Sequence, residues 1–337
     1  MPHFSGRISS ILLLLALSGS AASGCDSSDP DDGNDTTERP TFYVEGRHLY
    51  DVCGEPVVLR GVNKMTVWMD RQGSTFPEIA KTGANAVRTV WSIEVEPQQA
   101  DLLLLNAKRH GLIPMLEMHD ATGNWGMLDR VVDYWTRPET VQLIRKHEKY
   151  LLVNIANEAG QDVPDNTYRD KYIQIIQRMR RAGIRVPLVV DASGWGRDHE
   201  QVLRVGPAIV ASDSLKNTMM SVHWWHSDNN TQRITSALER SVSLNLPFIV
   251  GEFAHAEIGC RGRIAYEHIL AEAQRLGIGW LAWSWGPGNS DCAAMDMTED
   301  GSFDSLHEWG LEVAVTDPNS IKNTSVRPHY MVNGTCE

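Results

Sequence analysis

Eight short apolar runs, with polar or helix-like sequence between them, constrain the fold of this chain of 337 residues more than any other feature. Near-continuous apolar runs of this length are typical of parallel strands that are buried on both faces. The runs are Val57–Val62, Ala86–Trp91, Ile113–Met118, Tyr150–Ala156, Pro187–Val190, Met219–Trp225, Phe248–Phe253 and Gly279–Trp285. Apolar residues at helical spacing lie between them, at Gln98–His110, Leu128–His147 (with a break expected at Pro138), Asp170–Ala182, Thr231–Leu244 and Arg263–Leu276. This alternation predicts an α/β fold, a (β/α)8 TIM barrel.

An open, doubly wound sheet is the alternative arrangement of the same elements. Such a sheet binds nucleotides through a G-x-G-x-x-G motif after its first strand, and no such motif follows Val57–Val62. Ahead of the barrel, Phe42–Val44 and His48–Val52 flank the polar Glu45–Arg47, which predicts a short N-terminal β-hairpin.

The first 40 residues have the composition of a targeting segment and a linker. Arg7 precedes the apolar run Ile11–Leu17, which is too short to span a bilayer, and small residues follow, so residues 1–24 are predicted to be a signal peptide. The sequence Ala22-Ser23-Gly24-Cys25 resembles a bacterial lipobox, which predicts a lipid anchor at Cys25. A plain secretory signal is the alternative. Residues 25–40, with six acidic residues and one basic residue, are predicted to be a disordered acidic linker before a folded domain at 41–337. The protein is therefore expected to be exported, as a cell-surface or periplasmic lipoprotein or as a secreted protein.

Charge and cysteine content narrow the classes of protein further. A net charge of −12 argues against a nucleic-acid groove, which needs a basic surface. Besides Cys25 there are four cysteines, an even number that suits disulfides in an oxidising compartment. Cys260 and Cys292 follow consecutive predicted strands and could meet on one rim, while Cys53 and Cys336 lie near the two ends of the fold; the pairing stays open. No C-x-x-C or histidine-rich cluster occurs, so we expect no metal and no cofactor.

Two glutamates, Glu158 and Glu252, each lie at the end of a strongly apolar run, at the strand ends where TIM barrels carry their active sites. A buried carboxylate costs several kcal/mol unless it is paired or used. Glycosidic hydrolysis needs two carboxyl groups, one to protonate the leaving oxygen and one to attack the anomeric carbon or to activate water. The pair therefore predicts a glycosidase.

The tryptophan content agrees with this prediction, because the chain has 11 tryptophans and only 6 phenylalanines. Flat rings stack on the C–H faces of sugars. We expect the tryptophans at or after strand ends to line the cleft and those in or beside helices to lie in the core. The first group is Trp68, Trp195, Trp225, Trp283 and Trp285, and the second is Trp135, Trp280 and Trp309.

The stretches Ile155-Ala156-Asn157-Glu158 and Ile249-Val250-Gly251-Glu252-Phe253 resemble the catalytic motifs of glycoside hydrolase family 5. Supporting stretches run in order from about Val44 to about Ile321, and within the family they are most similar to the bacterial endo-β-1,4-mannanases. The resemblance implies a retaining mechanism in which Glu158 is the acid/base and Glu252 the nucleophile. It also implies a substrate-binding set, which we take to be Trp68, Arg88, His119, Asn157, Trp195, His223, Trp225 and Trp283. Within it, Asn157 would bind the sugar 2-hydroxyl and Arg88 would pair with Glu252 and keep it ionised.

The sequence departs from the family at Trp225, where the family usually has a tyrosine whose hydroxyl contacts the nucleophile. Indole has one N–H donor and no acceptor. Trp225 therefore either donates to Glu252 or leaves it one partner short, with a raised pKa. The expected substrate is a β-mannan, cleaved internally by a monomeric enzyme. The alternatives are the same chemistry on a β-1,4-glucan, or a glycan-binding barrel that has lost catalysis.

Overall fold

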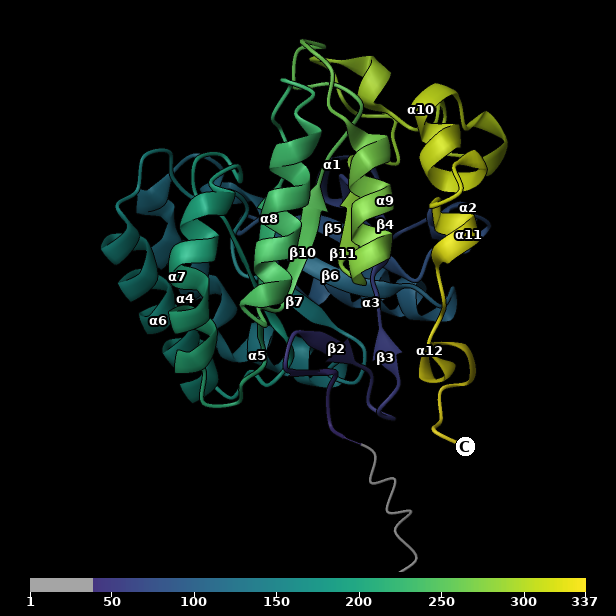
Figure 1. Cartoon of the computed structure of the whole chain (residues 1–337). Coiled ribbons are helices and arrows are strands. Elements are labelled where there is room, and N and C mark those ends of the chain that lie inside the picture. The colour runs from purple at the N-terminus through teal and green to yellow at the C-terminus, as the bar shows by residue number, and fades with distance from the viewer. Residues whose placement is uncertain (1–38) are drawn as a thin grey trace, which may run out of the picture. The chain divides into compact units, whose positions relative to one another are not determined.

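The computed structural model describes residues 39–337, and its centre is a closed barrel of eight parallel strands (Figure 1). Around the barrel the order is β10-β11-β4-β5-β6-β7-β8-β9. The strands are β4 Arg60–Lys64, β5 Ala86–Trp91, β6 Ile113–Met118, β7 Leu152–Asn154, β8 Leu188–Asp191, β9 Thr218–His223, β10 Phe248–Glu252 and β11 Gly279–Ala282, and every residue in them is buried. The predicted TIM barrel is confirmed.

The N-terminal hairpin is also confirmed, as part of a separate three-stranded antiparallel sheet. Its strands are β1 Tyr43–Glu45, β2 His48–Tyr50 and β3 Pro56–Val57. The prediction that Val57–Val62 forms one strand is wrong, because this run is divided between β3 and the barrel strand β4. Pro56 has no N–H to give to a ladder, which suits the edge position of β3.

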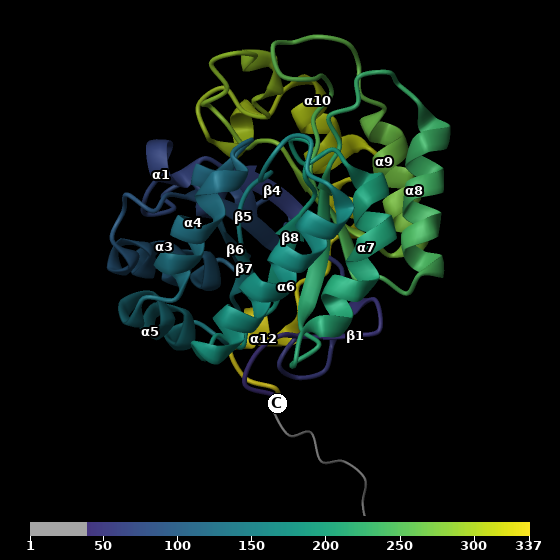
Figure 2. The same cartoon turned by 90° about the vertical axis from the view of Figure 1, so that its left-hand side faces the viewer.

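Helices surround the barrel (Figure 2). The longer ones are α3 Ala100–Arg109, α4 Leu128–Trp135, α5 Pro138–Lys146, α6 Asp165–Arg181, α7 His199–Ser212, α8 Thr231–Ser243 and α9 Tyr266–Leu276. Pro138 begins α5, which confirms the expected break. The sequence did not predict α7, since Gly206 and Pro207 interrupt its pattern. Shorter helices are α1 Thr66–Met69, α2 Phe76–Ala80, α10 Glu308–Leu311, α11 Ile321–Thr324 and α12 His329–Asn333, with 3-10 or π turns at Pro97–Gln99, His119–Ala121, Trp125–Met127, Ala293–Met295, Phe303–Ser305 and Glu312–Thr316.

Most of the tryptophans follow the expected division, and Trp285 departs from it most clearly. Trp135, Trp280 and Trp309 are buried, as predicted. Trp285 was expected in the cleft, but it is fully buried and its indole N–H donates to the carbonyl of Gly301 at 2.8 Å. The reason is that β11 ends at Ala282, three residues before the apolar run does, so the chain has already turned away.

Two disulfides, Cys53–Cys336 and Cys260–Cys292, resolve the pairing that the sequence left open. The predicted signal peptide and the lipidation site at Cys25 lie outside the described residues. The last residues of the predicted linker are described, and the N–H of Arg39 donates to the carbonyl of Val52. Among the described residues, no helix has the length and hydrophobicity needed to cross a membrane.

The disulfide Cys53–Cys336 should contribute to stability without affecting catalysis. It closes a sequence separation of 283 residues and packs beside the amino ends of the barrel strands. The double substitution Cys53→Ser, Cys336→Ser should therefore lower the free energy of unfolding by about 2–5 kcal/mol, measured by urea denaturation. Activity per folded molecule should stay the same, and either an unchanged stability or a loss of that activity would contradict this assignment.

Candidate active site

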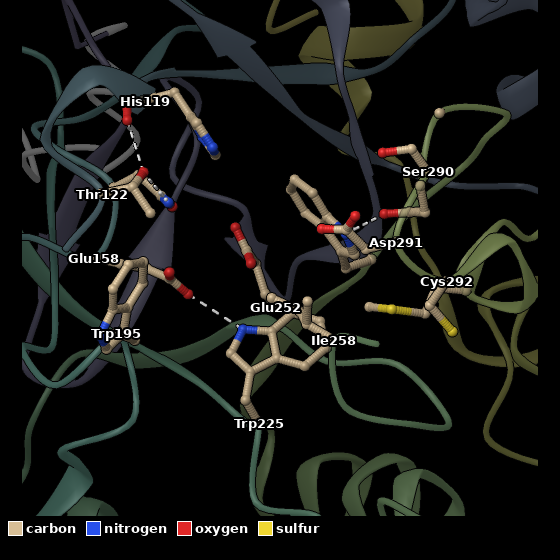
Figure 3. Close-up of a pocket in the computed structure, with 15 residues that line it drawn as sticks. His119, Thr122, Glu158, Trp195, Trp225, Glu252, Ile258, Ser290, Asp291 and Cys292 are labelled. Atoms are coloured by element: carbon tan, nitrogen blue, oxygen red, sulfur yellow. Dashed lines mark hydrogen bonds between the residues drawn. The ribbon is translucent and has the colours of Figure 1, made fainter. Parts of the chain in front are cut away.

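A cleft opens at the carboxyl ends of the barrel strands (Figure 3). Seven of the ten predicted site residues line it: His119, Asn157, Glu158, Trp195, Trp225, Glu252 and Trp283. Arg88 and His223 are fully buried and contact the two glutamates from below. Trp68 is not among the lining residues. It is 57% exposed and its ring packs edge-on against His119, with 5.2 Å between ring centroids.

Glu252 is the last residue of β10, and an irregularity in that strand sets the orientation of its side chain. The register between β10 and β9 shifts between Val250 and Glu252, so Gly251 is an extra residue in the ladder. A side chain at Gly251 would lie 2.3 Å from Oγ of Ser221, so only glycine fits there. Such a bulge turns the strand end locally and re-aims the residue that follows it.

Glu158 lies in the turn after β7, with a left-handed φ of 44° that is uncommon outside glycine. Its carbonyl accepts a hydrogen bond from the N–H of Gly123 at 2.9 Å, which holds the turn against the loop after β6. Strained backbone of this kind persists where surrounding contacts hold it, and it concentrates at functional sites.

The two carboxylates face each other across the cleft. Glu158, His223 and Glu252 each place one side-chain N or O atom so that all three atoms lie within 4.8 Å of one another. The same three groups are a possible metal cradle. However, the Arg88 guanidinium lies 2.5 Å from Glu252, and its positive charge would oppose a bound cation. A pair of acids with separate roles explains the arrangement better.

Arg88, on β5, connects the polar groups beneath the cleft, and its pairing with Glu252 is confirmed. Its Nε donates to Asn154, one terminal nitrogen donates to Asn63 and Glu252, and the other donates to Asn157 and Asp191. The planar fork of arginine suits this many fixed acceptors. The guanidinium thus aligns the nucleophile candidate with the residue next to Glu158.

Burial and charge act in opposition on the groups that titrate here. Burial raises the pKa of Glu252 to about 7, although the positive charges of His223 and Arg88 oppose the rise. The expectation that Arg88 keeps Glu252 ionised therefore underestimated how far burial raises the pKa of this carboxyl group. Burial alone would lower the pKa of His223, but the carboxylates of Glu252 and Asp191 and its hydrogen bonds raise it to about 10. His223 is thus an imidazolium: its Nδ1 donates to Glu158, whereas its Nε2 has no hydrogen-bond partner among the described residues and lies 3.4 Å from Asp191 as an ion pair.

Trp225 donates its indole N–H to Glu158 and not to Glu252. Its Nε1 donates to Oε1 of Glu158 at 3.2 Å (Figure 3). Of the two alternatives that the sequence left open, the second therefore holds: Glu252 is one hydrogen-bond partner short. His223 Nδ1 lies 2.6 Å from the same oxygen of Glu158 and 3.3 Å from Oε2 of Glu252. Among the described residues, Arg88 alone donates a hydrogen bond to the side chain of Glu252, and the imidazolium of His223 is a second charged neighbour.

Several buried polar residues around the site lie outside the predicted catalytic and substrate-binding set. Glu117 lies 3.0 Å from Nδ1 of His119, and Asp191 lies 3.4 Å from Nε2 of His223, so each carboxylate orients a histidine. Asn154 bonds both Arg88 and Asp191. Glu117 and Asn154 are polar residues within otherwise apolar strands, which is the signal that identified the two catalytic candidates. The loop Gly288–Cys292 also lines the cleft, and nothing in its sequence indicated this.

This fold and site define a carbohydrate-active barrel, and comparison with known proteins identifies its family. Residues 50–289 match the model of the cellulase family, glycosyl hydrolase family 5. The chain belongs to glycosyl hydrolase family 5. It is 33% identical over 293 residues to a mannan endo-1,4-beta-mannosidase of Salipaludibacillus agaradhaerens, which covers 84% of this chain and 94% of the relative. It is 34% identical to an enzyme of the same name from Cellvibrio japonicus, over 84% of this chain and 68% of the relative.

Solved structures give the same result. A β-mannanase from Thermomonospora fusca superposes with a TM-score of 0.81 at 32% identity, covering 86% of this chain and 99% of that one. Its complex with mannohexaose superposes with a TM-score of 0.80. An endoglucanase from Thermobifida fusca has a TM-score of 0.64 at 20% identity, which shows a shared fold only.

Proposed function

We propose that this chain is a retaining endo-β-1,4-mannanase in which Glu252 is the nucleophile and Glu158 the acid/base. The observation that carries the proposal is the pair of carboxylates within 4.8 Å of each other in a cleft that tryptophans line. Retaining glycosidases hold their carboxyl groups about 5–5.5 Å apart, whereas inverting enzymes leave about 6.5–9.5 Å for a water molecule. The short separation supports direct attack by a carboxylate.

In the first step, ionised Glu252 attacks the anomeric carbon while Glu158 gives its proton to the departing glycosidic oxygen. Arg88 holds one oxygen of Glu252 and leaves the other beside His223, so the carboxylate is aimed before the substrate binds. In the second step, Glu158 takes a proton from water, and the water oxygen displaces Glu252 from the sugar. The anomeric configuration is inverted twice and is therefore retained.

The remaining predicted residues bind the sugar chain in this account. Trp283 forms the floor of the cleft, and its indole N–H donates to Asn289 at 2.8 Å, which fixes the orientation of the ring. Asn157 lies beside Glu158, where it can bond a 2-hydroxyl, and Arg88 orients its amide at 2.6 Å. His119, Trp195 and the exposed Trp68 extend the surface on which further sugar units can stack.

A β-1,4-glucan is the second candidate substrate, since one relative, 28% identical, is a β-mannanase/endoglucanase A of Caldicellulosiruptor saccharolyticus. The test is to measure reducing ends released from galactomannan, glucomannan and carboxymethylcellulose. We expect release from both mannans and at least tenfold less from carboxymethylcellulose. Equal or greater release from carboxymethylcellulose would favour the glucanase, and binding without any release would favour a non-catalytic barrel.

The pH dependence follows from the position of Glu252. The nucleophile must be ionised, so kcat/KM rises as pH increases through its pKa, and burial raises that pKa to about 7. The acidic limb of a kcat/KM profile on mannohexaose should therefore lie well above the ordinary glutamate value of 4.5. A limb at 4.5, measured where the fold is intact by circular dichroism, would mean that Arg88 and His223 outweigh burial.

We also propose that the protein is exported, is anchored by lipid at Cys25 and acts as a monomer on polysaccharide outside the cytoplasm. The lipobox-like sequence and the acidic linker support this, and the disulfides agree with an oxidising compartment. Palmitate incorporation that depends on Cys25 is the test of the anchor.

A further inference from the structure

Oε1 of Glu158 receives hydrogen bonds from two different rings, and this pattern has a consequence for catalysis. Trp225 Nε1 donates to it at 3.2 Å, and His223 Nδ1 donates to it at 2.6 Å. Within the described part of the chain, Oε2 of Glu158 has no hydrogen-bond partner in the protein. We propose that Trp225 is a positioning residue for Glu158, which holds Oε1 so that the proton for the leaving sugar resides on Oε2. This inference rests on the proposed role of Glu158.

The donors are fixed firmly enough for this role. Trp225, His223 and Glu158 are at most 5% exposed. The N–H of Trp225 donates to the carbonyl of His223 at 3.1 Å, so both rings are held on one short segment after β9. The segment also packs closely, since a side chain at Gly196 would lie 2.7 Å from the ring of His223. The ring of His223 cannot turn without disturbing its contact with Gly196.

The chemistry of the two donors determines which oxygen of Glu158 carries the proton. Indole has a donor and no acceptor, and the imidazolium of His223 likewise only donates. An oxygen that accepts from both cannot also point a hydroxyl hydrogen at either, so in the neutral acid Oε1 is the carbonyl oxygen and Oε2 carries the hydrogen. As the glycosidic C–O bond breaks, that hydrogen passes from Oε2 to the departing oxygen, and Oε2 regains one from water in the second step. The N–H of Trp225 stays in place throughout.

Compared with a tyrosine at this position, Trp225 gives its hydrogen bond to Glu158 instead of Glu252. The resemblance to the family implies a tyrosine at this position, whose hydroxyl would contact Glu252. The indole reaches across to Glu158 instead, so the acid/base gains a donor that the nucleophile lacks. The result should be a selective effect on proton transfer.

The test compares Trp225→Phe with Trp224→Phe as a matched control, using two substrates. Trp224 is the adjacent buried tryptophan, which packs against the rings of His199 and His226 and has no side-chain contact with Glu158. Mannohexaose requires protonation of its leaving sugar, whereas the dinitrophenolate of 2,4-dinitrophenyl β-mannobioside leaves without a proton. For Trp225→Phe we expect kcat/KM to fall about 10- to 100-fold on mannohexaose and less than about 3-fold on the aryl substrate. For Trp224→Phe the two substrates should change by equal factors.

An equal loss on both substrates with Trp225→Phe would overturn the inference, because a role in packing or binding affects both. An unchanged kcat/KM on mannohexaose would also overturn it. If the wild-type protein does not cleave mannohexaose at all, the proposed function fails, and this outcome is distinct from a failure of the inference about Trp225.

Discussion

Glu252→Gln should lower kcat on mannan by on the order of 10⁵-fold, the scale seen when a covalent nucleophile is removed, while mannohexaose still binds. The amide has nearly the shape of the carboxylate and can accept from Arg88, so the cleft should stay intact. It cannot form the glycosyl-enzyme, because its oxygen is a poor nucleophile. Calorimetric titration with mannohexaose and reducing-end assays measure the two parts of this expectation.

Azide distinguishes the roles of the two glutamates. With the aryl mannobioside, Glu252→Ala should form the α-glycosyl azide, because azide enters from the face that the carboxylate has vacated. Glu158→Ala should form the β-azide from the glycosyl-enzyme, since azide needs no general base. Glu200→Gln serves as a control carboxylate, as Glu200 pairs with Arg240 on helices outside the cleft. Exchanged azide products, or turnover that persists in Glu252→Gln, would remove Glu252 from the nucleophile role.

Arg88→Met should have the largest effect on stability, lowering the free energy of unfolding by about 3–5 kcal/mol. Methionine fills much of the same space but leaves Glu252 and Asp191 buried without their shared cation. Activity should fall as well, because the pKa of Glu252 then rises further and its carboxyl loses the donor that aims it. Urea denaturation and kcat on mannohexaose measure the two losses.

Arg180 offers a matched control for Arg88. Its side chain is only 5% exposed, and it forms a bidentate pair with Asp213 at 2.9 and 2.8 Å, outside the lining of the cleft. Arg180→Met should lower stability but leave activity per folded molecule unchanged. If Arg88→Met behaves in the same way, Arg88 is a structural residue. If it unfolds no more easily than the wild type, the buried network does not depend on it.

The sequence predicted the barrel because burial on both faces forces every strand to be apolar, and that pattern is visible along the chain. It failed where contacts between distant segments decide the outcome. Pro56 and Val57 join the N-terminal sheet rather than the barrel, and Trp285 turns inward to Gly301. The neighbouring sequence does not indicate that Pro56 and Val57 pair with the N-terminal sheet, nor that Trp285 bonds Gly301.

In the site, too, the sequence predicted what a local pattern reveals and missed what distant contacts decide. Glu158 and Glu252 were found because a carboxylate in an apolar run is anomalous, and Glu117 carries the same mark in Ile113–Met118. The partner of Trp225 was not predictable, since Glu158 and Glu252 lie within 4.8 Å of each other and the orientation of the indole decides between them. The raised pKa of Glu252 likewise depends on a depth of burial that the sequence does not express.

The configuration of the first product tests the central claim most directly. Proton NMR of mannohexaose during the first minutes of hydrolysis resolves the anomeric hydrogens of new reducing ends before they mutarotate. Internal cleavage by the two facing carboxylates predicts short mannooligosaccharides whose reducing ends are first β and only later α. New ends that first appear as α would show that water attacks the sugar directly and would contradict the assignment of Glu252 as a nucleophile.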